Sequence, residues 1–392
     1  MSPVILQLTL PGYRVIRVES NVLMRVYLEV LDTPTSCPYC TASRLRSKGR
    51  YERRARHLAC FGHKSEVVIA CRRYRCVECN KSFVQPLRGL TSGRHSTQPW
   101  REEVYERHDR GIPASSLARS EAMGRATVSR IYAEFTEKRA KERTVDACPV
   151  VLGIDEHTLH KGQRFATTFC DLKKRRVFDI APGRSEWELR PFLSQLKGRD
   201  KVRVVCIDLS SSYRSLVKRW FPNALIVADR FHAIRLAGLH LMRVARQLCP
   251  QLGWNRSWLG LLRRRNDRLD PAQKDQLHRL FGQHPALRPI YSMKERLHAL
   301  LSFKMLSRIS CRQRTPQLLA AIQTLRESGL EAALTLAKTL TDWIEEIARM
   351  WRFTRNNGIT EGFHRKMKLI QRRAYGFRSF SNYRLRVIAQ CG

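Results

Sequence analysis

Short apolar segments that resemble β-strands alternate with amphipathic segments that resemble helices between residues 148 and 232. The strand-like segments are CPVVLGIDEHT, QRFATTFCDL, RRVFDIAPG, KVRVVCIDLS and NALIVADRFH, and the helical ones are SEWELRPFLSQL and SSYRSLVKRWF. Ser185 is a candidate N-cap for the first of these helices. The order β-β-β-α-β-α-β predicts a mixed α/β sheet, with three antiparallel strands first and helical crossovers afterwards.

Acidic residues end several of these apolar strands. Asp155 and Glu156 end the first strand, Asp208 ends the fourth, and Asp229 ends the fifth. Carboxylates at neighbouring strand ends repel each other and are costly to bury unless a cation neutralises them. Hard oxygen donors suit Mg²⁺ or Mn²⁺, and two such ions can promote in-line phosphoryl transfer.

The predicted metal ligands are therefore Asp155 and Asp208. Glu156 would point to the opposite face of its strand, and Asp229 is predicted to lie near the site, behind the ligands or beside a DNA end. The alternative interpretation is that these acids are ordinary loop residues that follow strands.

Two Cys-x-x-Cys pairs lie near the N-terminus, Cys37 with Cys40 and Cys76 with Cys79. Four thiolates suit a structural zinc ion with no open position. The 35 residues between the pairs exceed the commonest spacing, but this interval alternates like β-strands. Free, reduced cysteines are the alternative. Further candidate ligands lie in the same interval: His57, Cys60, His63 and Cys71.

A helical pattern begins at about Thr97, in TQPWREEVYERHDRG, and continues in PASSLARSEAMGRATVSRIYAEF. Apolar residues at helical spacing around a turn at Met123–Gly124 predict two short helices of the helix-turn-helix type. An ordinary helical hairpin is the alternative. The second helix would present polar residues to the major groove and the phosphates: Arg125, Thr127, Ser129 and Arg130.

The charge of the chain indicates a polyanionic partner. Lys and Arg total 73 against 34 Asp and Glu, so the formal net charge is +39. The basic residues lie along the whole chain and not on one amphipathic helix, which favours nucleic acid over a membrane surface. No run approaches the roughly 18 apolar residues of a membrane span, and the N-terminus lacks a secretory signal pattern. We expect a cytoplasmic protein, associated with the nucleoid through DNA, whose twelve cysteines are reduced.

From about residue 233 to residue 354 no strand pattern recurs, which predicts an all-α block. Beyond it, RNNGITEGFHRKMKLIQRRAYGF places one acid, Glu361, in a strongly basic helix. Thr360 or Asn357 can cap this helix, so that Glu361 lies in the first turn, where the helix dipole favours a carboxylate. Basic side chains further along the helix are predicted to contact DNA phosphates: Arg365, Lys368 and Arg372.

Three of these blocks together resemble a known family. GIDEHT, CIDLSSSYRSLVKRWFPNALIVADRFHAIRL and NNGITEGFHRKMKLIQRRAYGFRSFSNYRLRVI look like the blocks of the bacterial insertion-sequence transposases of the ISL-three family. CPYC through RRYRCVECNKSF resembles the zinc-binding N-terminal domain of that family, which a helix-turn-helix follows. The resemblance spans nearly the whole chain and is weakest across the helical block. It departs at His364, where family members usually carry Asn, and the role of His364 stays open.

The resemblance implies a DDE transposase in which Asp155, Asp208 and Glu361 form the catalytic triad and hold two Mg²⁺ or Mn²⁺ ions. Such an enzyme binds terminal inverted repeats and target DNA, cleaves and transfers DNA strands, and assembles as a homodimer or larger complex. The alternatives are a DNA-binding regulator or domesticated transposase without cleavage activity, and an RNase H-like nuclease that acts on branched nucleic acid.

The predicted fold is thus multidomain α/β, with an RNase H-like catalytic core that an all-α insertion interrupts. The expected domains are a zinc-binding β module (1–92), a helix-turn-helix (93–145), the first part of the core (146–232), the insertion (233–354) and the C-terminal helical part of the core (355–392).

Overall fold

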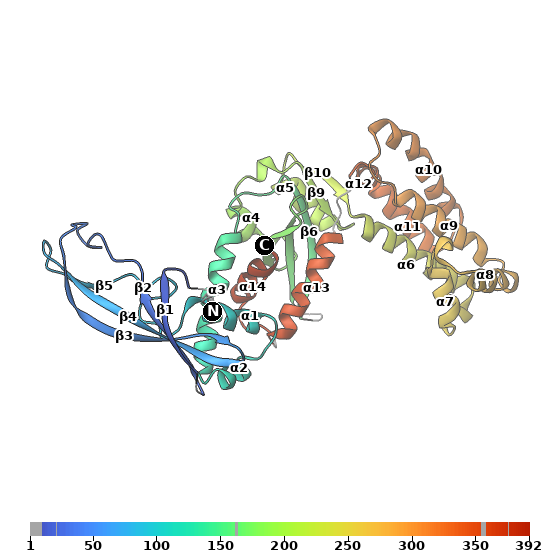
Figure 1. Ribbon diagram of the computed structural model, residues 1–392. Coiled ribbons are helices and arrows are strands. Elements are labelled where there is room, and N and C mark those ends of the chain that lie inside the picture. The colour runs from blue at the N-terminus through green and yellow to red at the C-terminus, as the bar shows by residue number, and fades with distance from the viewer. Residues whose placement is uncertain (1–9, 21, 161–163, 354–357, 375) are drawn as a thin grey trace. The chain divides into compact units, whose positions relative to one another are not determined.

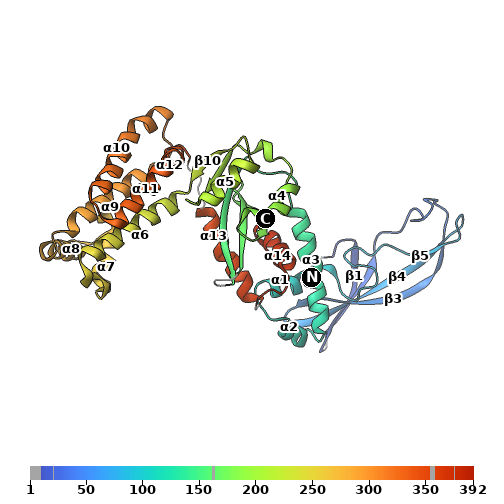
Figure 2. The ribbon, with the colours of Figure 1, turned by 180° about the vertical axis from the view of Figure 1, so that it is seen from behind.

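The computed structural model describes residues 10–20, 22–160, 164–353, 358–374 and 376–392. The chain divides into two compact units, with the boundary between Lys138 and Arg139. Figures 1 and 2 show the elements of each unit from opposite sides. None of the described helices is long and apolar enough to cross a membrane.

The first unit contains a five-stranded sheet of order β1-β2-β4-β3, with β5 paired to β4. Its strands are β1 (Tyr13–Ser20), β2 (Met24–Val30), β3 (Leu45–Cys60), β4 (His63–Cys76) and β5 (Ser82–Val84). Strands β3 and β4 form a long antiparallel hairpin that turns at Phe61 and Gly62, both of which have positive φ. This hairpin occupies the interval between the two cysteine pairs and explains its length.

Three helices follow the sheet: α1 (Gln98–Asp109), α2 (Ala114–Ser120) and α3 (Arg125–Arg143). They enclose a small apolar core that includes Trp100, Tyr105, Leu117 and Ile131. The turn between α2 and α3 lies where the sequence predicts it. The prediction of a short second helix is wrong, because α3 continues to Arg143 through TEKRAKER, a segment rich in strong helix formers.

The second unit contains a five-stranded sheet of order β10-β9-β6-β7-β8. Strands β6 (Val151–His160), β7 (Arg164–Asp171) and β8 (Arg176–Pro182) are antiparallel, and β9 (Val204–Ile207) and β10 (Leu225–Ala228) run parallel to β6. The predicted mixed α/β order is therefore confirmed. The crossovers are α4 (Glu186–Gln195) and α5 (Ser211–Trp220).

The two faces of this sheet are covered by different helices. On one face, Leu152 and Phe169 share a core with Leu189 of α4 and Leu216 of α5. On the other face, Cys170 and Val177 pack with residues of α13 (Gly358–Arg373) and α14 (Phe380–Cys391), such as Met367 and Val387. In Figures 1 and 2, α13 lies beside β6, and α14 contacts β8.

Local signals account for the start of α4. The hydroxyl of Ser185 accepts a hydrogen bond from the amide of Glu188, and the Glu188 carboxylate accepts one from the Ser185 amide, which together form a capping box. The N-cap predicted for α13 is not observed at Thr360. Thr360 is buried inside the first turn, so it does not cap this helix, and Asn357 lies outside the described residues.

Between β10 and α13, the described residues form helices that extend from the β10 edge of the sheet (Figures 1 and 2). Trp343, Ile347 and Trp351 share one apolar core with Val227 of β10, so this helical block is joined to the sheet by packing. The helices are α6 (Arg230–Leu248), α7 (Arg256–Arg263), α8 (Pro271–Gln283), α9 (Leu287–Leu301), α10 (Arg308–Glu327), α11 (Glu331–Asp342) and α12 (Ile344–Met350).

Candidate active site and zinc site

Three aspartates lie at the same level across three adjacent parallel strands. The pairing of β6 with β9 runs as far as Gly153 and Cys206, so Asp155 and Asp208, each two residues further on, lie side by side. Asp229 follows β10 in the same way that Asp208 follows β9. The register of the parallel strands therefore gathers the three carboxylates at one edge of the sheet.

The predicted position of Asp155 at a strand end is wrong. Strand β6 continues to His160, because it pairs with β7 as a long hairpin in which Asp155 faces Thr168. Only the parallel neighbour β9 ends at this level. Asp155 therefore lies in the middle of a strand but at the end of its pairing with β9, which still places it beside Asp208.

Burial and the charges of neighbouring acids make Asp155 and Asp208 hard to ionise. Burial raises the pKa of Asp155 to about 7, and the charges of Asp208 and Asp229 add to the effect. Burial likewise raises the pKa of Asp208 to about 6, with further contributions from Glu156 and Asp229. Oδ1 of Asp208 is buried without a hydrogen-bond partner. A cation bound between Asp155 and Asp208 would reduce the repulsion between the carboxylates and would give Oδ1 of Asp208 a partner.

His232 is a neighbour of the aspartates that the sequence analysis did not assign to the site. Asp229 is fully buried and caps α6 by accepting a hydrogen bond from the His232 amide. The His232 Nδ1 also lies 2.6 Å from Oδ2 of Asp229, and this hydrogen bond raises the pKa of His232. A charged His232 lowers the pKa of both Asp155 and Asp208. In the sequence, the pattern Asp-x-x-His directly after a strand could have indicated that His232 lies beside Asp229.

Helix α13 approaches the aspartates through His364. Its Nδ1 lies 3.9 Å from Oδ2 of Asp155, and its Nε2 lies 3.1 Å from Oγ1 of Thr168. Burial and the charge of Lys368 lower the pKa of His364 to about 4, so the ring is neutral near pH 7. Glu361 lies one turn earlier and accepts a hydrogen bond of 3.1 Å from Arg365.

The predicted DNA-contacting side chains lie on two helices. On α3, Arg125, Ser129 and Arg130 are exposed, and Thr127 is partly buried and accepts a hydrogen bond of 3.2 Å from Arg130. On α13, the predicted basic side chains are exposed as well: Arg365, Lys368 and Arg372.

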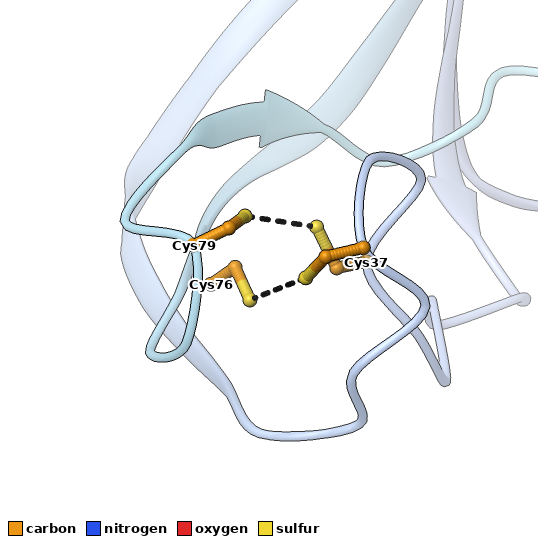
Figure 3. Close-up of side chains that lie close together, drawn as sticks. Cys37, Cys76 and Cys79 are labelled. Atoms are coloured by element: carbon orange, nitrogen blue, oxygen red, sulfur yellow. Dashed lines mark hydrogen bonds between the residues drawn. The ribbon is translucent and has the colours of Figure 1, made fainter.

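The four predicted zinc ligands come together at the open end of the β3–β4 hairpin, away from its turn. Figure 3 labels three of them, Cys37, Cys76 and Cys79. The sulfur atoms of Cys37 and Cys79 lie 3.6 Å apart and those of Cys40 and Cys76 3.5 Å apart. All four sulfurs lie within 4.8 Å of one another, and across the described residues this is the one group of three or more potential ligands so closely gathered. The acids Asp155, Asp208 and Glu361 are not gathered as closely as this.

The local backbone favours a thiolate in this cluster. Burial opposes ionisation of Cys37, but hydrogen bonds from the amides of Tyr39 and Cys40 and from the thiols of Cys79 and Cys40 together lower the pKa of Cys37 to about 7. The alternative ligands lie elsewhere. Cys71 is buried in the core of the sheet, and His57 lies 2.9 Å from the Thr97 hydroxyl.

Comparison with known proteins places the chain in a family. A family model described as a transposase, that of the ISL3 (ISL-three) DDE enzymes, matches residues 152–387, more than half of the chain. The chain belongs to the ISL3 family of insertion-sequence transposases. A second model, the zinc-finger of transposase IS204/IS1001/IS1096/IS1165, matches residues 33–79, which contain all four clustered cysteines. The resemblance seen in the sequence is confirmed.

A curated relative of this transposase extends the comparison to nearly the whole chain. The transposase for insertion sequence element IS1001 of Bordetella parapertussis is 28% identical over 404 residues, which cover 96% of this chain and 95% of the relative. The zinc-finger match and the cysteine cluster together support a structural zinc site in the first unit.

Proposed function

We propose that this transposase binds the terminal inverted repeats of its element and catalyses metal-dependent cleavage and strand transfer of DNA, with Asp155, Asp208 and Glu361 as the acids of a DDE site. The observation that carries the proposal is the side-by-side placement of Asp155, which is buried, and Asp208, which is partly buried, with the pKa of each raised by burial and by neighbouring acids.

The arrangement of the second unit supports an RNase H-like catalytic core. Asp155 lies on the first strand of the sheet, Asp208 follows the fourth, and Glu361 lies on a late helix that contacts the first strand. This is the arrangement that the family resemblance implies. Under this proposal the helical block between β10 and α13 is the insertion domain.

The residues present fit Mg²⁺ or Mn²⁺. Carboxylate oxygens are the donors that these ions prefer, and the unpartnered, buried Oδ1 of Asp208 is a ready ligand atom. Asp155 and Asp208 would hold the ions, with Glu361 as the third carboxylate. When bound, two such ions supply activation of the attacking water or 3′-hydroxyl and stabilise the leaving oxygen.

Other side chains of the second unit would position the acids and the substrate. Asp229 holds His232, which when protonated lowers the pKa of the neighbouring Asp155 and Asp208. The exposed Arg365, Lys368 and Arg372 supply positive charge along α13 for the phosphates next to the scissile bond.

Recognition of the DNA ends is assigned to the first unit. The zinc ion held by the four cysteines would stabilise the end of the β3–β4 hairpin, and α2 and α3 would act as a helix-turn-helix. Arg125, Ser129 and Arg130 are exposed at the start of α3, the part of a recognition helix that reads base edges. A homodimer or larger complex would hold two ends together.

Cleavage of a duplex that carries the end of the element itself, taken from the DNA that flanks the coding region, tests this proposal. Wild type and Glu345→Gln, a control at an exposed residue of α12 paired with Arg349, are expected to cut with Mg²⁺ and leave a 3′-hydroxyl. Asp155→Asn, Asp208→Asn and Glu361→Gln are each expected to lose at least ~100-fold, the loss of a few kcal/mol of transition-state stabilisation.

Two results would contradict the proposal in different ways. End binding by the wild type without any metal-dependent product favours a DNA-binding regulator instead. Full cleavage by Asp155→Asn refutes the assignment of that residue.

A further inference from the structure

A cavity of about 610 Å³ lies in the second unit, beside α13 and α14, at a distance from the aspartates. Its walls come from the β6–β7 hairpin, the segment after β8, and the connection between α13 and α14. Aromatic rings and guanidinium groups make up much of its lining: Phe165, Arg184, Phe377, Arg378, Phe380 and Tyr383.

The rings offer flat apolar surfaces. The ring of Tyr383 lies 5.1 Å from that of Phe377 and 6.1 Å from that of Phe380, measured between centroids. Tyr383 is buried and forms part of the core, whereas Phe377 and Phe380 are partly exposed. The cavity can therefore accept a planar group against ring surface that the core does not use.

Positive charge lies next to these rings. The guanidinium of Arg184 is 4.1 Å from the centre of the Phe165 ring, and the exposed Arg378 lies between Phe377 and Phe380 in the chain. A purely apolar ligand would gain little from these cations. Aromatic faces beside arginines are the combination that binds the bases and phosphates of single-stranded nucleic acid.

A continuous series of contacts links the cavity to the acids. The hydroxyl of Tyr383 lies 2.9 Å from Nε2 of His157, and Nδ1 of His157 lies 3.0 Å from the hydroxyl of Thr168. The same hydroxyl lies 3.1 Å from His364, which is 3.9 Å from Asp155. The cavity is thus linked to Asp155 through buried hydrogen bonds that end at His364, the residue that approaches this acid.

The distance between the cavity and the acids corresponds to a short run of nucleotides. Leu159, which lines the cavity, is four residues beyond Asp155 on β6, or about 13 Å along the strand. Gln371, which also lines it, is ten residues beyond Glu361 on α13, or about 15 Å along the helix. At about 3.4 Å per stacked nucleotide and more for a stretched strand, this is roughly two to four nucleotides.

We propose that the cavity holds a nucleobase of the DNA end, unstacked from its duplex, two to four nucleotides from the scissile phosphate. The inference rests on the proposed function, because it requires DNA to lie across Asp155 and Asp208. Phe377 and Phe380 replace the stacking that the base loses, Arg184 and Arg378 neutralise nearby phosphates, and exposed Lys368 lies between the cavity and the acids. By holding this base, the cavity determines which phosphate of the DNA strand lies at the acids.

Photocrosslinking of the full-length chain tests where the base goes. The probe is the duplex end of the element, with 5-iodouracil placed at one position at a time. The protein binds this probe in a buffer that contains Ca²⁺, and the complex is irradiated. The crosslinked protein is then digested with trypsin and its peptides are analysed by mass spectrometry. Positions two to four nucleotides from the cut are expected to crosslink to the tryptic peptides 374–378 or 379–384. Crosslinks from these positions only to other peptides overturn the inference, as does crosslinking of these peptides by target DNA alone.

Cleavage assays add a second test. Phe377→Leu keeps an apolar side chain against Tyr383 but removes the ring, and it is expected to slow cleavage of the intact end at least tenfold. On an end with an abasic site at the crosslinked position, the variant and the wild type are expected to cut at the same rate. Trp187→Ala, at an 83% exposed aromatic residue on α4, is the control and is expected to cut both ends as the wild type does.

The two proposals fail in distinguishable ways. If the wild type cuts the end and Phe377→Leu cuts the intact end equally fast, the cavity inference is wrong and the DDE assignment stands. If the wild type makes no metal-dependent product on any end, the proposed function is wrong, and the crosslinks still report whether a base enters the cavity.

Discussion

Asp155 on β6 lies level with Asp208, the residue that follows β9, because the parallel pairing of these strands ends two residues before each of them. Among the ion pairs of the described residues, neither carboxylate contacts a Lys or Arg side chain, and the His364 ring, which lies 3.9 Å from Asp155, is neutral near pH 7. The pair therefore stores electrostatic repulsion that a bound cation would release.

The first prediction concerns stability and pH. The pKa values of about 7 for Asp155 and about 6 for Asp208 exceed the ordinary 3.8, so the metal-free folded state binds more protons than the unfolded chain between pH ~4 and ~7. The stability due to this pair is present at low pH and is lost as the pH rises through that window. Asp155→Asn should therefore raise the melting temperature of metal-free protein by about 3–6 °C at pH 8 and by little at pH 4.

Thermal melts of both proteins at pH 4, 6 and 8 provide the measurement. Asp200→Asn, at an exposed acid before β9, serves as the control and should melt like the wild type throughout. An equal gain for Asp155→Asn at all three pH values would show that ionisation of this pair is not the cause.

The second prediction concerns zinc. Cys76→Ser is expected to lose the single equivalent of bound zinc, since three thiolates leave the tetrahedral site incomplete. Because metal binding is coupled to folding, hydrogen exchange should increase across residues 37–45 and 74–83. Cys60→Ser, at a partly buried cysteine outside the cluster, should keep its zinc. Full zinc content in Cys76→Ser would contradict the four-cysteine site.

The third prediction concerns the junction between α5 and α12. Arg214 forms a salt bridge with the buried Glu346, and its guanidinium lies 4.2 Å from the ring centre of Trp343. Glu346→Gln leaves a partly buried cation without its partner, which should destabilise the second unit by about 2 kcal/mol and lower its melting temperature by about 4–8 °C.

The adjacent residue offers the matched control for that change. Glu345 pairs with Arg349 on the surface of the same helix, and exposed pairs of this kind contribute only about 0.3–0.5 kcal/mol. Glu345→Gln should therefore melt within about 2 °C of the wild type. Similar losses for the two variants would mean that burial of the Arg214 pair is unimportant.

The fourth prediction concerns DNA recognition by α3. Arg130→Ala should weaken binding of the terminal-repeat duplex by about 5- to 150-fold, the equivalent of about 1–3 kcal/mol for a specific base contact. Lys141→Ala removes an exposed charge near the other end of the same helix and should change affinity by no more than about twofold. Binding is measured by fluorescence anisotropy at fixed salt. Equal effects of the two substitutions would place the recognition surface elsewhere.

Structural features that are determined by residues close together in the chain were predictable from the sequence. The capping box of Ser185 and Glu188, the turn before α3, and the alternation of strands and helices around Asp208 all follow from local patterns. The four cysteines were predictable as well, because two Cys-x-x-Cys pairs supply the four ligands of a tetrahedral site. The intervening hairpin only has to bring the second pair back beside the first.

Predictions failed where a distant segment decides the outcome. The polar residues after Asp155 look like the end of a strand, yet pairing with β7 continues β6 to His160. Thr360 has the side chain of a cap, but packing buries it inside the first turn of α13. The roles of His232 and His364 depend on partners that only the folded sheet and α13 bring near.

By itself the sequence determined the class of the protein, the order of its elements, the zinc ligands and the identity of its candidate acids, because residue type and periodicity carry that information. Only the tertiary structure decided that Asp229 and His232 join Asp155 and Asp208, that His364 approaches them, and that an aromatic cavity lies along the same helix. The reason is physical: strand register and helix packing join residues that are far apart in the chain, and no local pattern encodes those contacts.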